Sequence, residues 1–596
     1  MSWSSMRVLL VSNARPSRAW KLALRLTREV PGAKVCGIVQ RPLRDLPLIQ
    51  QRIAFGALGE GNSPRSTSSR VQCWIRAAGE RLVDHVLWWI HGCPSGLRRT
   101  RAFTGETLAK ECSAKHWPLL EAVSFSEEGP VEFIRRAAPD LIISLGQVPC
   151  TTLLQSRPRH GLIRIQEASA RNEPEQPRDA LQITLEHVAS HPAPRCSLAS
   201  LMLPLQRDDG PLGFRLKADL IADDLLTEAA AGMKSGSTTQ AAEQVKQWTS
   251  QILSPYLGQL PALTAATSRP TSHAFCRSRL RLYLESVLLA SPFVMVRNWF
   301  RRARGRYPAL ILAYHLVSDR EHRMGISTER FWRQVRFLKR HYRIVGLSDA
   351  VRLLHSGEIR VPTVALTFDD GYADNFVSLR AVANEADIPV SIFVTTQPVS
   401  LHKEFQHDVA NGERGAFPLS WDQVRWWSRR GAEFGSHTRT HANCGTSETA
   451  ALREELLGAR ADLEREVGSS VPFFAFPYGQ RETISDEATR VAQSTYGHFL
   501  SSFGGENLPH EAGNHVHLFR KPAYTEPWEL ELDLQSVFDL VDTAKRWFRA
   551  RVGSAQLSAG WGRSRRQEPG DGARRAQPGL NPACEAPVSR TTAASE

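Results

Sequence analysis

The sequence is poor in the features that stabilise secreted or membrane-embedded proteins. Its nine cysteines are scattered over 596 residues without any CxxC pair, which argues against a disulfide framework and a cysteine-type zinc site. No run of about 18 apolar residues occurs, so no segment qualifies as a membrane-spanning helix. The N-terminal apolar run, Val8 to Val11, is shorter than the ~7 to 15 residues of a signal-peptide core. We therefore expect a first β-strand there and a cytoplasmic protein.

Positive charge is concentrated in one segment of a chain that is otherwise ordinary in composition. The net charge is +14, and residues 269–306 hold nine arginines against one acid, Glu285. Residues 282–296 in this segment are mostly apolar. Such a helix can lie on an anionic membrane surface but cannot span it; a helix packed between domains with a solvated basic edge is the alternative. The first interpretation predicts peripheral contact of residues 277–306 with the inner face of the membrane. Nucleic acid is not expected as a partner, because no stacking motif accompanies the charge.

The chain length predicts about three domains, and two α/β regions can be recognised. In residues 1–235, short β-branched runs alternate with helical periodicity, which is typical of a parallel sheet. Residues 236–306 are expected to be a linker that carries the basic apolar helix. In residues 307–550 about six strands are each followed by a helix, a pattern that predicts a (β/α) barrel. Residues 551–596 are rich in Arg, Gly, Pro and Ala and predict a disordered tail.

Polar side chains follow the predicted barrel strands at their carboxyl ends. Asp369 and Asp370 follow one strand, and His437 and His441 follow another. Because these ends meet on one face of a barrel, the side chains are expected to converge. Two histidines four residues apart and one carboxylate can hold a metal ion and leave a position open for water, as in catalytic sites. The other aspartate is then free to act as a general base.

These residues resemble the polysaccharide deacetylases that share the NodB homology domain. The resemblance covers roughly residues 307–549 and rests on TFDDG at 367–371, SHTRTH at 436–441 and FAFPYG at 474–479. It implies a divalent metal, zinc by preference, bound by Asp370, His437 and His441, with Asp369 as the base. It further implies that the backbone N–H of Tyr478 binds the oxyanion and that the FAFPYG loop shapes the substrate groove. Substrate contacts are expected from Tyr372, Phe476, Pro477 and Gly479.

The sequence departs from the family pattern at two places. The late Leu-x-His motif that supplies the proton to the leaving amine is absent, and His517 is the candidate for this catalytic role, with His515 beside it. Position 476 is Phe where many members have Arg, so the arginine that orients the base is expected to be missing.

The N-terminal half resembles, more weakly, the formyltransferases related to methionyl-tRNA formyltransferase. The similarity covers about residues 6–233 and implies a Rossmann-like parallel sheet. Arg164 and Gln166 stand where that family needs Asn and His. Glutamine is no general acid, and arginine places a permanent cation at the oxyanion position. The domain is therefore expected to have the formyltransferase fold without the activity.

Together these observations predict a metal-dependent hydrolase. It would remove an acetyl or formyl group from an amino sugar of a polysaccharide or glycolipid precursor, with the N-terminal domain positioning the substrate. A bifunctional formyltransferase and deacetylase is one alternative, and formyl transfer from a folate donor would distinguish it. A non-catalytic carbohydrate-binding scaffold is the other, and it would release no acetate or formate.

Overall fold

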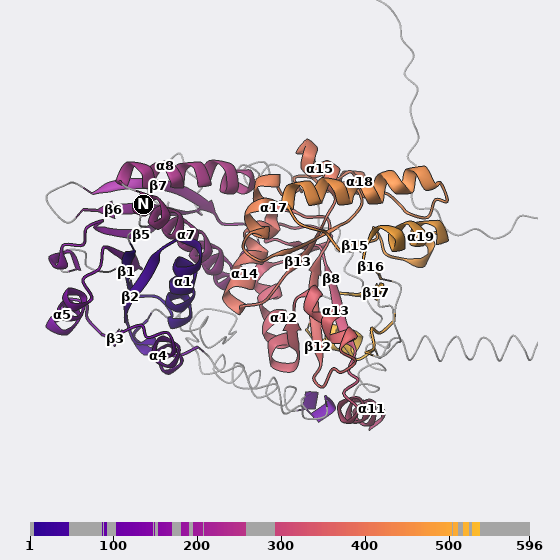
Figure 1. Ribbon diagram of the computed structural model, residues 1–596, viewed down its shortest axis with the longest axis horizontal. Helices are drawn as coiled ribbons and strands as arrows, with labels where there is room; N and C mark the ends of the chain where they lie inside the picture. Colours follow the sequence, from indigo (N-terminus) through magenta and orange to yellow (C-terminus); the bar gives the residue numbers. More distant parts are fainter. Residues whose placement is uncertain are drawn as a thin grey trace, which may run out of the picture. The chain divides into compact units, whose positions relative to one another are not determined.

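The computed structural model describes two α/β parts, each built on its own sheet (Figure 1). The predicted tail 551–596 and residues 277–291 of the predicted basic helix lie outside the described residues. In the described part of the chain, no helix is long and apolar enough to cross a membrane. The described residues are 5–46, 86–87, 89–91, 103–146, 148, 153–169, 180–189, 195–206, 208–235, 237–257, 292–502, 505–509, 516–523 and 527–536.

The N-terminal sheet has the strand order β3-β2-β1-β4-β5-β6-β7. Pairing is parallel from β3 to β5 and antiparallel from β5 to β7. The chain order reverses between β1 and β4, which creates a topological switch point. The strands are β1 (Met6–Ser12), β2 (Ala33–Gln40), β3 (Leu119–Glu121), β4 (Leu141–Leu145), β5 (Leu162–Ser169), β6 (Ala180–Val188) and β7 (Cys196–Pro204).

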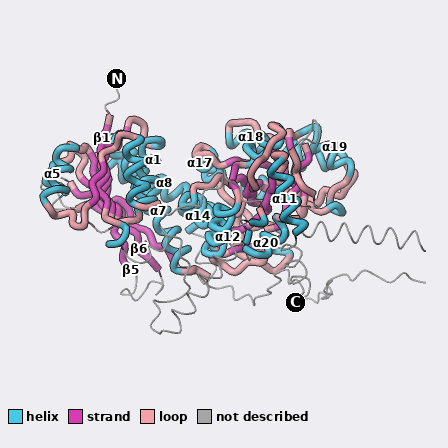
Figure 2. The backbone as a smooth tube through the Cα atoms, turned by 90° about the horizontal axis from the view of Figure 1, so that it is seen from below, coloured by secondary structure: helices cyan, strands magenta, loops and turns pink. Residues whose placement is uncertain are grey.

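Helices cover both faces of this sheet (Figure 2). Leu9 and Val11 of β1 pack in one core cluster with Ile134 of α5 (Glu128–Ala137). Val8 and Leu10 pack in another, which includes α1 (Pro16–Glu29), α4 (Gly105–Ala114), α7 (Pro211–Ser235) and α8 (Thr238–Trp248). This alternation is expected for a parallel strand that is buried on both sides. It confirms the predicted α/β class.

The C-terminal part is a parallel sheet that nearly closes into a barrel. Its strand order is β17-β16-β15-β14-β13-β12-β8-β18, and β11 pairs with β12. The strands are β8 (Ala309–Tyr314), β11 (Arg343–Val345), β12 (Thr363–Phe368), β13 (Ser391–Val394), β14 (Glu433–Ser436), β15 (Phe473–Ala475), β16 (His498–Ser501), β17 (His517–Phe519) and β18 (Lys521–Pro522), with a short separate pair β9 (Leu316–Val317) and β10 (Gly325–Ile326). The helices are α11 (Pro292–Ala303), α12 (Thr328–His341), α13 (Leu347–His355), α14 (Ser378–Ala386), α15 (Thr396–Leu401), α16 (Gln406–Ala410), α17 (Trp421–Ser428), α18 (Thr449–Val467), α19 (Asp486–Thr495) and α20 (Pro527–Leu534).

One residue brings the two ends of this sheet together. β17 pairs with β16 at one end of the strand order and β18 pairs with β8 at the other. Only Arg520 lies between β17 and β18 in the chain. The predicted barrel is thus confirmed, and Arg520 sits where its two edges meet.

Helix α7 connects the two parts. It packs on α1 and also on α12 and α14 of the barrel. Leu216 and Leu220 of α7 belong to the same hydrophobic core cluster as Phe376 and Leu379. The domain limits predicted from the sequence stay predictions, since packing is continuous across this junction.

Candidate active site

Two aspartates follow β12, a strand whose six residues are all buried. The backbone N–H of Asp369 donates to the carbonyl oxygen of Tyr314, which ends the neighbouring β8 (2.9 Å). Asp370 and Gly371 both have positive φ, 68° and 84°, so the chain turns sharply at the strand end. For a non-glycine residue such a conformation costs about 1–3 kcal/mol and is typical of functional sites. Both carboxylates are buried at the carboxyl edge of the barrel.

Asp370 meets the two histidines that follow β14. Its Oδ1 lies 3.6 Å from Nε2 of His437 and 3.3 Å from Nε2 of His441. One ligand atom from each of the three residues lies within 4.8 Å of the others. The loop that carries the histidines also has positive φ at Thr438 (62°) and at His441 (64°). The structure thus brings together the three predicted metal ligands.

The hydrogen bonds around these residues suit a divalent cation. Nδ1 of His437 lies 2.8 Å from the carbonyl oxygen of Ala475; because a carbonyl only accepts, Nδ1 carries the proton and Nε2 offers its lone pair. Oδ1 of Asp370 is buried and accepts no hydrogen bond from the described residues. One oxygen and two imidazole nitrogens are a common ligand set for a catalytic divalent metal, and they leave an open position.

Burial controls the protonation of the three groups. It lowers the pKa of His437 to about 3 and that of His441 to about 4. Both imidazoles are therefore neutral near pH 7, which is the form that binds metals. Burial also raises the pKa of Asp370, against the opposing effect of His407 and His315. The neighbouring imidazoles alone thus do not compensate for burial of this carboxylate, and a bound cation would.

Asp369, the predicted base, is paired with an arginine that sequence reasoning missed. Nη1 of Arg520 donates to Oδ1 of Asp369 at 2.6 Å, and the Arg520 side chain is 1% exposed. Burial raises the pKa of Asp369, but the charge and hydrogen bond of Arg520, together with the nearby His437 and His315, outweigh burial and lower the pKa to about 2. The expectation that the arginine beside the predicted base is missing is therefore wrong. Arg520 supplies this contact from the junction of β17 and β18 instead of from position 476.

Two further histidines lie close to the aspartates. His315 follows β8 directly in the chain. Burial lowers its pKa, and the charges of Asp369 and Asp370 oppose this effect. His407 of α16 has Nε2 3.8 Å from Oδ2 of Asp370, and its ring centre is 4.1 Å from that of His441. The position of His315 directly after a barrel strand is a signal that could have found it. His407 lies in the long segment between β13 and β14, where no strand end marks it.

The FAFPYG loop passes beside the histidines. Tyr478 is 53% exposed, and its ring centre lies 5.0 Å from that of His441. Tyr478 and Gly479 have φ of 62° and 63°. A Cβ on Gly479 would come within 2.8 Å of Oγ of Ser502, so only glycine fits there. Pro477 is buried beneath this turn. The loop therefore presents Tyr478 at the surface next to a predicted metal ligand.

Three predicted site residues occupy different surroundings. Tyr372 is fully buried and donates to Oδ2 of Asp408 (2.8 Å), and Phe476 lies in a core cluster, 1% exposed. Neither side chain is available to contact a sugar. His517 begins β17, whereas the site lies at the carboxyl ends of the strands, and its Nε2 is 2.7 Å from Oγ of Ser501. No contact described for His517 joins it to the two aspartates, so its catalytic role stays a prediction.

The N-terminal residues that replace formyltransferase groups line a cavity of about 580 Å³. Arg164 and Gln166 of β5 are part of it, and Arg164 pairs with Glu186 at 2.8 Å. Farther along the chain, Asp209 forms a buried ion pair with Lys217 (2.6 Å). The absence of formyltransferase activity stays a prediction.

Comparison with known proteins identifies the class of the barrel. Residues 357–497 match the family model "Polysaccharide deacetylase", so this part of the chain is a polysaccharide deacetylase domain. This family indicates carbohydrate de-N-acetylase activity, as predicted. No curated protein matches the sequence significantly.

Solved structures resemble each half of the chain. The deacetylase PplD from Streptococcus pyogenes, in complex with acetate, is 18% identical over 38% of this chain and 98% of its own, with a TM-score of 0.33. IcaB from Ammonifex degensii is 20% identical over 38% of this chain and 97% of its own, with a TM-score of 0.32. The phosphoribosylglycinamide formyltransferase from Bacillus halodurans is 8% identical over 39% of this chain and 96% of its own, with a TM-score of 0.23.

Proposed function

We propose that this protein is a metal-dependent hydrolase that removes an acetyl or formyl group from an amino sugar of a polysaccharide or glycolipid precursor. The observation that carries the proposal is the cluster of Asp370, His437 and His441 beside the ion-paired Asp369. The cluster lies at the carboxyl edge of a barrel whose family is de-N-acetylating. A scaffold that only bound sugar would need neither the three converging ligand atoms nor a buried, oriented carboxylate.

Each residue has a chemical task in this proposal. A divalent cation, zinc by preference, held by Asp370, His437 and His441 supplies Lewis acidity toward the amide carbonyl and water. Asp369 accepts the proton of the attacking water, and Arg520 keeps this carboxylate ionised and oriented. The backbone N–H of Tyr478 donates to the oxyanion that develops on the carbonyl oxygen.

The leaving amine also needs a proton. The imidazoles of His315 and His407 lie with the aspartates at the carboxyl edge. The donor predicted from the sequence, His517, contacts Ser501, and its catalytic role stays a prediction. The exposed ring of Tyr478 is placed to contact a sugar face above the site.

Product analysis tests the function. The purified protein is expected to release acetate from N-acetylated glucosamine oligomers, or formate from the N-formylated ones, and to leave a free amine. Chelation followed by dialysis should remove the activity, and added zinc should restore it. Sugar binding without release of either acid, at every metal tested, would support the scaffold alternative.

The pairing of Arg520 with Asp369 predicts a change in pH dependence. In Arg520→Gln the charge that opposes the burial of Asp369 most strongly is lost, so the pKa of Asp369 rises. The base must be ionised, so when the pH is lowered the variant should lose activity at a higher pH than the wild type does. The acid limb of kcat/KM should move upward by about one pH unit or more.

Arg520→Lys is the matched control for this change. It keeps a positive charge beside the carboxylate, so its acid limb should stay close to that of the wild type. An acid limb of Arg520→Gln that coincides with the wild type would show that Arg520 does not set the pKa of Asp369.

Helix α11 supports a membrane contact at the cytoplasmic face, within the segment predicted from the sequence. Its polar side faces the protein: Asn298 donates to the backbone of Ile90, and Arg297 donates to the backbone of Gln535. Its apolar side is exposed, and Phe300 lies under the guanidinium of Arg304. The exposed large hydrophobic side chains on this helix are Phe293 (60%), Val296 (51%), Trp299 (58%) and Phe300 (44%). Aromatic groups flanked by arginines suit the interface of an anionic membrane.

Vesicle co-sedimentation tests this contact. The wild type should bind vesicles that contain phosphatidylserine more strongly than pure phosphatidylcholine vesicles. Trp299→Ser/Phe300→Ser should weaken binding by about tenfold or more, because two large apolar groups no longer enter the interface. Leu457→Ser, which changes an exposed apolar residue on α18 (44% exposed), is the control. Equal binding of all three proteins would contradict the proposal.

A further inference from the structure

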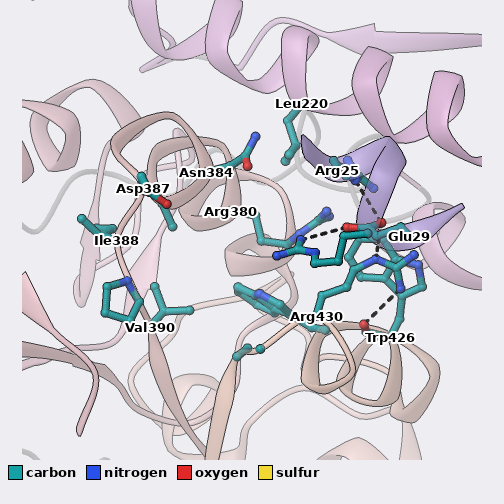
Figure 3. A pocket seen from close by; sticks show the side chains of 16 residues that line it. Arg25, Glu29, Leu220, Arg380, Asn384, Asp387, Ile388, Val390, Trp426 and Arg430 are labelled. Carbon is teal, nitrogen blue, oxygen red and sulfur yellow. Dashed lines mark hydrogen bonds and ion pairs between the residues drawn. The ribbon is translucent and has the colours of Figure 1, made fainter. Parts of the chain in front are cut away.

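A second cavity lies away from the candidate active site, where α1 and α7 meet the barrel. It has a volume of about 200 Å³ and is lined by residues of α1, α7, α14 and α17 and by the segments that precede β13 and β14. In a barrel this is the edge opposite to the one that carries Asp369 and His437. Figure 3 shows Arg25, Arg380 and Arg430 gathered near Glu29 and Trp426 in this cavity. Nothing in the proposed deacetylase chemistry uses these residues.

Two of the arginines share one carboxylate. Nη1 of Arg25 lies 2.5 Å from Oδ1 of Asp224, and Nη2 of Arg380 lies 3.2 Å from both oxygens of the same group. Burial is the main cause that lowers the pKa of Arg380 to about 10. The charges of Arg25 and Arg430 act in the same direction, and the carboxylate of Asp224 acts in the opposite direction. The carboxylate of Asp224 therefore does not offset the burial of the Arg380 guanidinium.

Glu29 is shared by three arginines. Its carboxylate lies 3.0 Å from Arg25, 3.1 Å from Arg28 and 2.9 Å from Arg430. Arg430 reaches one more carboxylate, Glu228, only at 3.5 Å. Arg28 also lines the cavity and is 68% exposed. In these contacts four guanidinium groups meet three carboxylates, and a fourth carboxylate, that of Asp387, also lines the cavity.

Buried donors in the cavity lack acceptors. Nη2 of Arg25 is buried and has no hydrogen-bond partner among the described residues, and the same holds for Nε1 of Trp426. Three guanidinium groups also surround the ring of Trp426, with Arg430 at 3.7 Å, Arg380 at 4.3 Å and Arg25 at 5.8 Å from its centre. Unpaired buried donors are costly, so a ligand rich in acceptor oxygens would be favoured here.

In the neighbouring part of the same junction, two arginines each contact two carboxylates. Arg15 contacts both Asp219 and Glu385, and Arg18 contacts both Asp219 and Asp223. The pKa of each of these arginines is raised, because the attraction of its carboxylates outweighs burial. The pKa of Arg380 moves in the opposite direction. Arg25 of the cavity behaves like Arg15 and Arg18, because its carboxylates raise its pKa, so among these arginines Arg380 is the one whose burial is not offset.

We propose that this cavity binds an oxyanion of the phosphate type between the N-terminal domain and the deacetylase domain. The guanidinium groups of Arg25, Arg28, Arg380 and Arg430 would donate to its oxygens. The ligand can be free phosphate or the phosphate group of a larger molecule such as a sugar phosphate. Because both domains line the cavity, binding stabilises their contact.

Thermal unfolding of the full chain tests the proposal. Inorganic phosphate, added at constant ionic strength against chloride, should raise the Tm in a saturable way by about 2 °C or more. A sugar 1-phosphate that raises the Tm at lower concentration than phosphate would assign the site to a phosphate ester, and an equal response would assign it to free phosphate. The same sugar without its phosphate is the control. No rise in Tm with either anion, or an equal rise with this neutral sugar, would overturn the proposal.

Variants locate the response in the cavity. Arg28→Gln changes an exposed side chain whose described partner is Glu29, so the fold should persist. It should require about tenfold more phosphate for the same rise in Tm. Arg352→Gln changes an arginine of similar exposure, 78%, outside the cavity and should respond like the wild type. Isothermal titration calorimetry with phosphate should rank the proteins in the same order, and identical affinities for all three would place binding elsewhere.

Discussion

Replacing His437 or His441 by alanine is expected to remove the bound metal and the hydrolytic activity together. Either change leaves two protein ligands where three ligand atoms now lie within 4.8 Å of one another. Loss of an outer partner of a metal ligand already weakens metal binding by about 10- to 100-fold, so loss of the ligand itself should exceed about 100-fold. Elemental analysis after gel filtration should show about one metal per wild-type chain and almost none in the variants.

His355→Ala is the matched control for the histidine substitutions. His355 ends α13 and is exposed, away from the described ligand cluster. This variant should keep its metal and its activity. Circular dichroism of all variants separates loss of metal from loss of the fold. Full metal retention in both His437→Ala and His441→Ala would reject the assigned site.

Asp369→Asn is expected to keep the metal and to lose turnover. Asparagine preserves the shape of the side chain but cannot accept the proton of water, and a general base typically contributes about 10²- to 10⁴-fold to the rate. The kcat for release of acetate or formate should fall by that factor, with the metal content unchanged. Asp422→Asn, which changes an exposed aspartate on α17 (49% exposed), should keep its kcat. Equal kcat in Asp369→Asn and wild type would show that another group is the base.

The main motifs could be found from the sequence because each follows a strand. Asp369 and Asp370 follow one predicted strand. His437 and His441 follow the second predicted strand after it. Parallel strands in a barrel place such residues on one face, so the cluster could be predicted without coordinates. What the sequence does not give is the strained backbone, with φ of 68° at Asp370 and 64° at His441, that turns the ligand atoms together.

Arg520 escaped prediction because the strands beside it are very short. β17 has three residues and β18 has two, too few for a period-two pattern to be visible. Only the closure of the sheet brings Arg520 next to Asp369, 151 positions earlier in the chain. The same short strand explains the choice of His517, which lies three residues before Arg520 and therefore at the other end of β17.

Buried aromatic residues near the motifs were also misjudged. Tyr372 and Phe476 stand beside the predicted ligand and oxyanion residues in the sequence, yet Tyr372 packs on Phe405 and Phe476 packs on Phe474. A residue next to a functional one in a turn points in a different direction, so closeness in sequence does not give access to substrate. Tyr478, in contrast, is 53% exposed.

Anomalous scattering from a crystal of the zinc-loaded protein tests the central claim most directly. The account predicts a single strong peak at the zinc edge, about 2.0–2.2 Å from Oδ1 of Asp370 and Nε2 of His437 and His441. Asp369 should remain outside the ligand set, paired with Arg520. A peak at another group of residues, or direct coordination by Asp369, would contradict the account.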